Sequence, residues 1–157
     1  MAKELKTGHS LANRWRPKTW DDVCGHVNIV SRLKGMLESR SLPNAILFAG
    51  PSGTGKTTLS RVFARYINCE HGTSCGECDS CRMMDNVTHP DYMEVDAGSS
   101  GGINDIRSLI DQAQKMPMLG NIRVIVLDES QALSGAAQTA ILKTLEEPPE
   151  HTLFILA

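Results

Sequence analysis

Residues 45–57 constrain the fold of this chain more than any other stretch. They read Ala-Ile-Leu-Phe-Ala-Gly-Pro-Ser-Gly-Thr-Gly-Lys-Thr, an apolar run of strand length followed by a glycine-rich turn. Lys56 and Thr57 then open a segment with apolar residues at helical spacing. A G-x-x-x-x-G-K-T spacing between strand and helix is typical of a phosphate-binding P-loop. Its glycines let backbone N–H groups surround an anion, and the helix N-terminus adds a positive dipole end.

The P-loop predicts a site for ATP and Mg²⁺. Lys56 is expected to reach the β- and γ-phosphates, and the Thr57 hydroxyl is expected to ligate Mg²⁺. The alternative, a chance match in a glycine-rich loop, does not explain why the motif lies between a strand and a helix. The residues predicted to bind the nucleotide here are Gly50, Ser52, Gly53, Thr54, Gly55, Lys56, Thr57 and Thr58.

A second strand-length run, residues 122–127, ends in Asp128 and Glu129. A strand apolar on both faces belongs inside a parallel sheet, and ligands gather at the carboxyl ends of such strands. We expect Asp128 to hold Mg²⁺, directly or through water, and Glu129 to polarise the water that attacks the γ-phosphate. An isolated Asp-Glu pair is usually a strand ending in solvent, but an upstream P-loop strengthens the prediction. Lys56, Asp128 and Glu129 are thus the predicted catalytic residues.

Four of the five cysteines cluster with the spacing C-x5-C-x2-C-x2-C, at Cys69, Cys75, Cys78 and Cys81. Four thiolates so close together suit tetrahedral zinc in a closed, structural site. Three alternatives remain open: an iron–sulfur cluster, a redox switch, and a zinc site in which His71 replaces one cysteine. Cys24, far away in the sequence, is predicted to be an ordinary small buried residue.

Charge and hydropathy limit the classes of partner. The formal net charge of −2 gives no global attraction to DNA or to a membrane, so any nucleic-acid contact must be local. No apolar run approaches the length of a membrane span, and the first residues do not resemble a signal peptide. A cytoplasmic protein without membrane partners is therefore expected. Residues 1–13 are predicted to be a flexible leader, and residues 14–157 one nucleotide-binding domain with a zinc module at 69–81.

The remaining segments predict an α/β fold with a parallel sheet and helices on both faces. Residues 14–26 hold both tryptophans. They are interpreted either as a surface loop with its rings packed on the core or as a segment that folds over the nucleotide base. The glycine-rich residues 96–102 are expected to form a flexible loop, which either binds a phosphate or simply connects two elements. Helices are expected at 27–40, 56–67, 103–115 and after Ser134, and strands at 45–49, 92–95, 122–129 and 152–157.

With these motifs in view, the chain resembles the N-terminal part of AAA+ clamp-loader motor subunits, the bacterial DNA polymerase III gamma/tau family. The resemblance spans roughly residues 14–157. It is carried by Arg16-Pro17 with Asp22-Val23-Cys24-Gly25-His26, the P-loop, the four inserted cysteines, Asp96-Ala97-Gly98-Ser99, the 128–134 segment and Leu142-Lys-Thr-Leu-Glu-Glu-Pro-Pro149. It implies a RecA-like three-layer core. It also implies that 14–25 cradle the adenine through Arg14, Arg16, Pro17 and Val23, that the cysteines bind structural zinc, and that 99–104 face DNA.

The chain also departs from the family pattern. Many relatives have basic residues where this chain has Ser100 and Gly102, and the stretch between Cys69 and Cys75 is shorter. The resemblance implies a strand order of 5-1-4-3-2, of which this sequence supplies strands 1 to 4, so strand 45–49 is expected at a sheet edge. The sequence given ends before the family's arginine finger, lid and collar.

These features lead to an ATPase hypothesis. The chain would bind and hydrolyse ATP in a ring with other clamp-loader subunits, which opens a sliding clamp and places it on primed DNA. Little or no turnover is expected from the chain alone, because it lacks an arginine finger for a neighbour. A non-hydrolysing nucleotide-binding module that docks in such a ring is the alternative. A small-molecule kinase is less consistent, because no substrate pocket or basic lid is evident.

Overall fold

The computed structural model describes residues 15–157, so the predicted leader at 1–13 and Arg14 lie outside the described residues. The helices are α2 (Val27–Glu38), α3 (Lys56–Asn68), α4 (Asp79–Asp85), α5 (Ala97–Ser100), α6 (Ile103–Ala113) and α7 (Gly135–Glu146), with one 3-10 turn, η1 (Ser130–Ala132). The strands are β1 (Ala45–Leu47), β2 (Tyr92–Asp96), β3 (Arg123–Asp128) and β4 (Thr152–Leu156).

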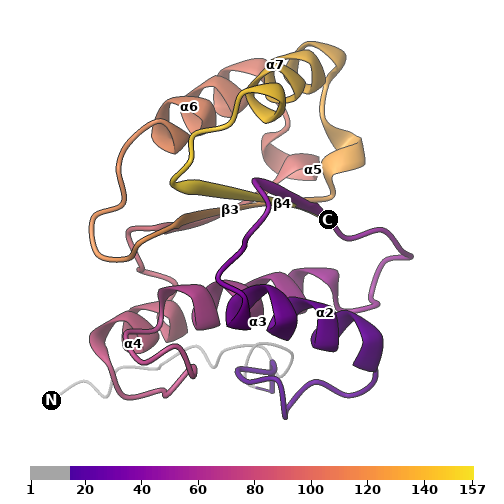
Figure 1. The fold of residues 1–157 in the computed structure, drawn as a ribbon. Coiled ribbons are helices and arrows are strands. Elements are labelled where there is room, and N and C mark those ends of the chain that lie inside the picture. Colours follow the sequence, from indigo (N-terminus) through magenta and orange to yellow (C-terminus); the bar gives the residue numbers. More distant parts are fainter. Residues whose placement is uncertain (1–14) are drawn as a thin grey trace, which may run out of the picture.

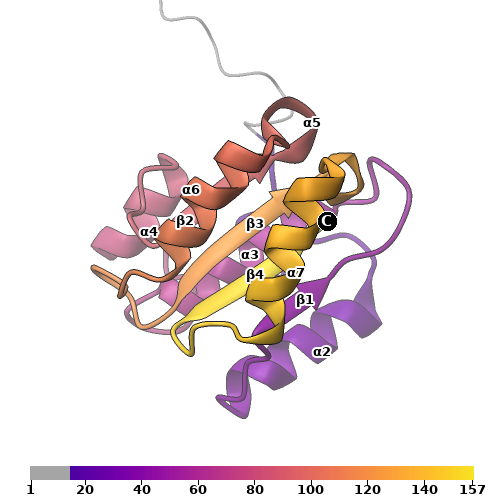
Figure 2. The ribbon, with the colours of Figure 1, turned by 90° about the horizontal axis from the view of Figure 1, so that it is seen from above.

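The four strands form one parallel sheet in the order β1-β4-β3-β2. This is the predicted order, and β1 lies at an edge as expected. Helices cover both faces: α2, α3 and α4 lie on one side of the sheet, and α5, α6 and α7 lie on the other (Figure 1). Seen from above, α6 and α7 lie over the sheet, with β2 and β1 at opposite edges (Figure 2). The predicted three-layer α/β architecture is confirmed.

Strand β3 fills the middle of both hydrophobic cores. Its residues from Val124 to Leu127 are all fully buried. Because side chains alternate along a strand, Val124 and Val126 join the cluster under α3, whereas Ile125 and Leu127 join the cluster under α6 and α7. A nearly continuous aliphatic run is what a strand covered on both faces requires.

The two tryptophans have different environments. The Trp20 side chain is buried and stacks on Tyr66 with ring centroids 5.0 Å apart, whereas Trp15 is exposed. The interpretation of this stretch as a loop packed by its rings is therefore right for Trp20 only. Cys24 is exposed, so the prediction that it is buried was wrong. It follows the turn after Trp20 and lies outside the packed part of this segment.

Several element boundaries differ from the sequence-based expectation. The segment expected as a flexible loop at 96–102 contains a one-turn helix, α5, whose N-cap Asp96 accepts a hydrogen bond from Gly98 N–H at 2.8 Å. The helix α4 inside the cysteine segment was not predicted. Glu129 does not continue β3, because its backbone turns into the left-handed region with φ 53°. Strand β1 spans three residues rather than five, and among the described strands it pairs with β4.

Candidate functional site

The predicted phosphate site lies where β1 passes through the P-loop into α3. Gly53 and Gly55 adopt φ angles of 80° and 90°, which residues with a β-carbon rarely adopt. No side chain caps α3, whose N-cap is Gly55, so the first N–H groups of this 13-residue helix have no side-chain acceptor. Such an uncapped N-terminus suits an anion. Lys56 Nζ lies 3.1 Å from both the Gly50 and the Pro51 carbonyl oxygens, at the mouth of the same loop.

The predicted magnesium ligands are in contact across the sheet. Thr57 Oγ1 donates to Asp128 Oδ2 at 2.6 Å, which joins the first turn of α3 to the carboxyl end of β3. Hydroxyl and carboxylate oxygens are hard ligands of the kind that Mg²⁺ prefers. The two predicted ligands, 71 positions apart in the sequence, are thus brought together at the expected sheet edge. This donor set fits a magnesium ion.

Glu129 follows directly, at the start of a tight turn. Its backbone N–H donates to Asp128 Oδ1 at 3.1 Å, and its carbonyl accepts from Ala132 N–H at 2.8 Å. The Glu129 carboxylate accepts a hydrogen bond from Gln131 Nε2. Sequence reasoning missed Gln131, because nothing in its type or spacing distinguishes it from a surface residue.

The segment proposed to hold the adenine base reaches the P-loop through His26. His26 Nε2 lies 3.0 Å from the Thr54 carbonyl oxygen, and His26 itself adopts φ 53°. Val23 and Gly25 line a cavity of about 400 Å³ between this segment and α2. His26 belongs to the 22–26 motif but is not among the predicted site residues. Its position directly after Gly25, at the end of the segment expected to hold the base, could have indicated a contact with the site.

The other two described residues of the predicted adenine set lie further along the segment. Pro17 is half-buried. Arg16 lies close enough to Glu94 for its charge to act on that carboxyl. Burial raises the pKa of Glu94, but hydrogen bonds from Arg61 and Tyr92, with the charges of Arg61 and Arg16, lower it below its usual value. The structure thus places Val23 in the cavity beside α2 and Arg16 near the Arg61–Glu94 ion pair.

The four clustered cysteines converge as predicted. The sulfur atoms of Cys69, Cys75, Cys78 and Cys81 all lie within 4.8 Å of one another. Burial raises the pKa of Cys69, but backbone N–H groups, that of Cys75 first, lower it to about 5. Burial first, together with the neighbouring Cys78 and Cys69, raises the pKa of Cys81 to about 12, although a hydrogen bond with the Gly76 backbone lowers it. Cys69 is therefore the more readily ionised thiol and Cys81 the less readily ionised one. Negative charges on several neighbouring sulfur atoms repel one another, and a bound divalent cation would relieve this repulsion.

His71 lies beside this cluster rather than inside it. Its Nδ1 is 3.4 Å from Cys75 Sγ, and the hydrogen bond with Cys75 raises the pKa of His71. Among the described residues, the convergent group consists of the four cysteines alone. This favours Cys₄ ligation over the alternative in which His71 replaces a cysteine, and it leaves His71 outside the ligand group, in contact with Cys75.

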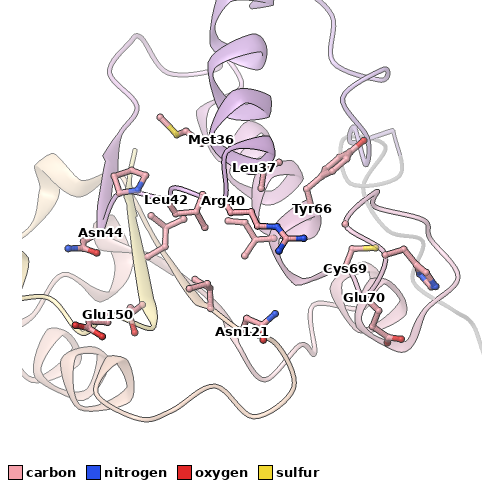
Figure 3. Close-up of a pocket in the computed structure, with 17 residues that line it drawn as sticks. Met36, Leu37, Arg40, Leu42, Asn44, Tyr66, Cys69, Glu70, Asn121 and Glu150 are labelled. Carbon is pink, nitrogen blue, oxygen red and sulfur yellow. The ribbon is translucent and has the colours of Figure 1, made fainter.

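A larger cavity, of about 700 Å³, lies at the amino ends of β1, β3 and β4 (Figure 3). Arg40 extends across its middle, towards the side on which Tyr66 and Cys69 lie (Figure 3). Its rim is mixed in charge, with Glu70 and Glu150 as well as Arg40. Because nucleotides bind at the carboxyl ends of parallel strands, this cavity is not the nucleotide site despite its size.

In the part of the chain that the structure covers, no helix is sufficiently long and apolar to span a bilayer.

Comparisons with known proteins show the family of this chain. A family model described as "DNA polymerase III, delta subunit" matches residues 25–157. DNA polymerase III subunit tau/gamma of Haemophilus influenzae is 43% identical over 150 residues, a match that covers 94% of this chain and 22% of the relative. The tau subunit of Escherichia coli is 42% identical over 150 residues, covering 94% of this chain and 23% of the relative. The tau subunit of Bacillus subtilis is 41% identical over 151 residues, covering 94% of this chain and 27% of that protein. The chain thus spans about a quarter of the length of these relatives.

Solved structures support the fold. A DNA polymerase III gamma subunit-related protein from Thermotoga maritima aligns with a TM-score of 0.60 at 23% identity, covering 79% of this chain and 38% of that chain. The RuvB Holliday junction branch migration motor of the same organism aligns with a TM-score of 0.57 at 21% identity, covering 90% of this chain and 40% of that one. At this identity the likeness concerns the fold alone, which is that of AAA+ P-loop proteins.

Proposed function

The chain belongs to the AAA+ DNA polymerase III subunit family that includes gamma/tau, and from this premise we propose that it binds and hydrolyses ATP as a clamp-loader motor subunit. The observation that carries the proposal is the 2.6 Å contact between Thr57 Oγ1 and Asp128 Oδ2. This contact joins the first turn after the P-loop to the carboxyl end of β3. A Mg²⁺ ion bound with a nucleotide would need both the Thr57 hydroxyl and the Asp128 carboxylate at this place. A motor function of the kind expected for full-length family members, with partner subunits and action on DNA, is likewise part of this proposal.

Each side chain of the site has a defined role in this account. Lys56, which now contacts two carbonyls of its own loop, would turn to the β- and γ-phosphate oxygens. The uncapped N–H groups of α3 would bind the phosphates, and Val23 and Gly25 would contact the base, together with Arg14, Arg16 and Pro17. Thr57 and Asp128 would hold Mg²⁺, which supplies charge neutralisation for the phosphates. Glu129 would orient the attacking water and take its proton.

The cysteine cluster is proposed to hold a structural zinc ion. Four sulfur ligands leave no open position for a substrate, so the ion would stabilise the 69–81 module rather than take part in the reaction. Residues 14–157 are proposed to form one nucleotide-binding domain. The segment 99–104, which includes the end of α5, is proposed to face DNA in a cytoplasmic assembly with other loader subunits and a sliding clamp.

Hydrolysis is proposed to require the assembly. An arginine supplied by a neighbouring subunit is worth about 10³–10⁵ in rate in related phosphoryl-transfer systems. The test is steady-state ATP hydrolysis in a loader reconstituted with its partner subunits, clamp and primed DNA. Wild type should turn over, whereas Glu129→Gln should keep ATP and lose at least about 100-fold in kcat, as expected for loss of a general base.

Binding without hydrolysis in the wild-type assembly would favour the alternative, a nucleotide-dependent docking module. Wild-type rates in Glu129→Gln would remove Glu129 from its proposed role. A chain that hydrolyses ATP alone, with stimulation by DNA, would contradict the requirement for an assembly.

A further inference from the structure

The Glu129 carboxylate has a hydrogen-bond partner to which the proposed function gives no role. Gln131 Nε2 donates to Glu129 Oε2 within the same turn. The side-chain amide of glutamine is neutral and cannot take a proton from water, but it is a good donor to a carboxylate. It engages one of the two carboxylate oxygens and leaves the other oxygen available.

The backbone that carries Gln131 is held from several sides. Ser130 donates to the Ala157 carbonyl oxygen through its backbone N–H at 2.9 Å and through its hydroxyl at 3.1 Å. The Glu129 carbonyl closes the turn on Ala132, and Leu133 is buried under the helices α6 and α7. The amide of Gln131 therefore reaches Glu129 from a turn that is anchored at both ends.

The same turn is packed against α5. Ser134 N–H donates to the Gly101 carbonyl oxygen at 3.2 Å, and a β-carbon at Gly101 would lie 3.2 Å from the Ala132 carbonyl oxygen. This close approach fixes η1 against the loop that follows α5. The backbone at Gln131 is thus held by packing between two elements, and its exposed side chain reaches Glu129 from this fixed point.

We propose that Gln131 is a positioning residue, whose amide fixes the Glu129 carboxylate in the orientation from which its free oxygen polarises the attacking water. This inference rests on the proposed function, since it needs Glu129 to act on water. Catalytic groups must be held within a fraction of an ångström of the productive geometry, and a free glutamate side chain samples several rotamers. A hydrogen bond from an anchored turn restricts that sampling.

If the contact between Gln131 and Glu129 has no role, a different result is expected. Gln131 is exposed, so its removal should then leave both folding and kinetics unchanged. A positioning role predicts that kcat falls while KM for ATP does not change, because Gln131 contacts neither the phosphates nor the predicted magnesium ligands. The split between kcat and KM distinguishes the two.

The kinetic test uses the reconstituted loader with Gln131→Ala, Gln131→His and, as matched control, Gln114→Ala, which removes an exposed glutamine at the end of α6. Gln131→Ala should lower kcat by about 10- to 100-fold with KM within about twofold of wild type, the loss typical of a misplaced catalytic group. Gln131→His, which keeps an N–H donor, should recover most of the rate. Wild-type kcat in Gln131→Ala would overturn the proposal.

A second readout does not depend on activity. The side-chain amide of Gln131 in the ¹⁵N-labelled chain is identified by the NMR signal that disappears in Gln131→Ala. Glu129→Gln should shift that signal, because the charged acceptor is lost. An unchanged signal would show that the contact is absent in solution and would overturn the inference. A wild-type loader without ATPase activity would overturn the proposed function and the role of Gln131 with it, whereas an active loader insensitive to Gln131→Ala would overturn the positioning role alone.

Discussion

At the scale of single residues, Asp91 makes contacts that hold the loop before β3. Its buried carboxylate accepts backbone N–H groups from Met118, Leu119 and Gly120 at 2.7, 2.7 and 2.8 Å. Its Oδ1 also lies 3.2 Å from Nη2 of Arg123, which is buried at the start of β3. This loop keeps Met116 and Met118 exposed, so burial of its own side chains contributes little to its order.

We expect Asp91→Ala to lower the free energy of unfolding by about 3–5 kcal/mol, the usual cost of leaving a buried charge without its partner. Urea unfolding of the chain would measure the difference. Asp105→Ala is the matched control, because Asp105 is an exposed carboxylate in the first turn of α6. A loss below about 1 kcal/mol in Asp91→Ala would show that water replaces these contacts at little cost.

The Asp91 contribution should depend on pH. Burial raises the pKa of Asp91, but the N–H groups of Gly120, Leu119 and Met118 and the charge of Arg123 lower it below its usual value. A carboxyl with a lowered folded-state pKa stabilises the fold above its unfolded pKa, about 3.9, and that stabilisation is lost as pH falls through the folded value. The stability difference between wild type and Asp91→Asn should therefore shrink on acidification. A constant difference from neutral pH down to pH 3 would contradict the assignment.

Residue roles were predictable from the sequence where a motif fixes the spacing, and not where a contact depends on a local turn. Thr57 and Asp128 were paired correctly, because a P-loop and a strand-end carboxylate meet at one sheet edge in a parallel fold. Gln131 escaped notice, because its contact exists only once Glu129 adopts a left-handed conformation. Cys24 was placed in the core on residue type alone, and the structure leaves it exposed.

At the scale of elements, the cysteine module is a short loop and one helix, α4, beside the end of α3. Cys81 in α4 is fully buried, and Cys78 caps that helix by accepting from Cys81 N–H at 3.4 Å. Beyond the cysteines, Ser80 Oγ donates to the Asn68 carbonyl oxygen at 2.5 Å and contacts His89 Nε2 at 3.0 Å. Few apolar side chains pack in this module, so a metal is expected to supply much of its stability.

Cys81→Ser should therefore reduce zinc from one ion per chain to well below one, with a lower melting temperature and a loss of helicity. Cys24→Ser is a matched control on a cysteine outside the cluster and should change none of these. Elemental analysis and far-UV circular dichroism provide the measurements. Full zinc content in Cys81→Ser would exclude Cys₄ ligation, and iron in the purified chain would favour the cluster alternative.

Short helices were the elements that sequence reasoning could not place. Helices α4 and α5 span seven and four residues, too few to show a helical repeat of apolar positions. The capping residue Asp96 was visible in the sequence, but the glycines around it favoured a loop. The long helices α3, α6 and α7 were predicted within a few residues, because each carries a clear apolar face and the loop before α7 supplies a Ser134 cap.

At the scale of the whole molecule, strand β1 leaves one side of the sheet unpaired in the part of the chain described here. It pairs with β4 only, and Leu47 on this strand is 68% exposed. An open edge strand that carries an apolar side chain is a template for pairing with another chain. The order β1-β4-β3-β2 was expected from the family resemblance, and its two central strands, β3 and β4, are buried along nearly their whole length. The shortness of β1 was not predicted, because residues 45–49 read as one uninterrupted apolar run.

The chain by itself is accordingly expected to self-associate as its concentration rises, and Leu47→Lys should suppress this without lowering the melting temperature. Met118→Lys is the matched control, because Met118 is 80% exposed and lies in the loop between α6 and β3, away from β1 in the sequence. Size-exclusion chromatography with light scattering would report the mass. Equal association in Leu47→Lys and wild type would place the contact elsewhere than at the β1 edge.

The P-loop, with Thr57 and Asp128, is proposed to form one site for Mg-ATP. Calorimetric titration of ATP into the 157-residue chain, with and without Mg²⁺, tests it most directly. The account predicts one site per chain, tighter binding with Mg²⁺, and at least about tenfold weaker binding in Lys56→Ala, equivalent to roughly 1.4 kcal/mol. Equal affinity in wild type and Lys56→Ala, or no binding to the folded wild-type chain, would contradict the account.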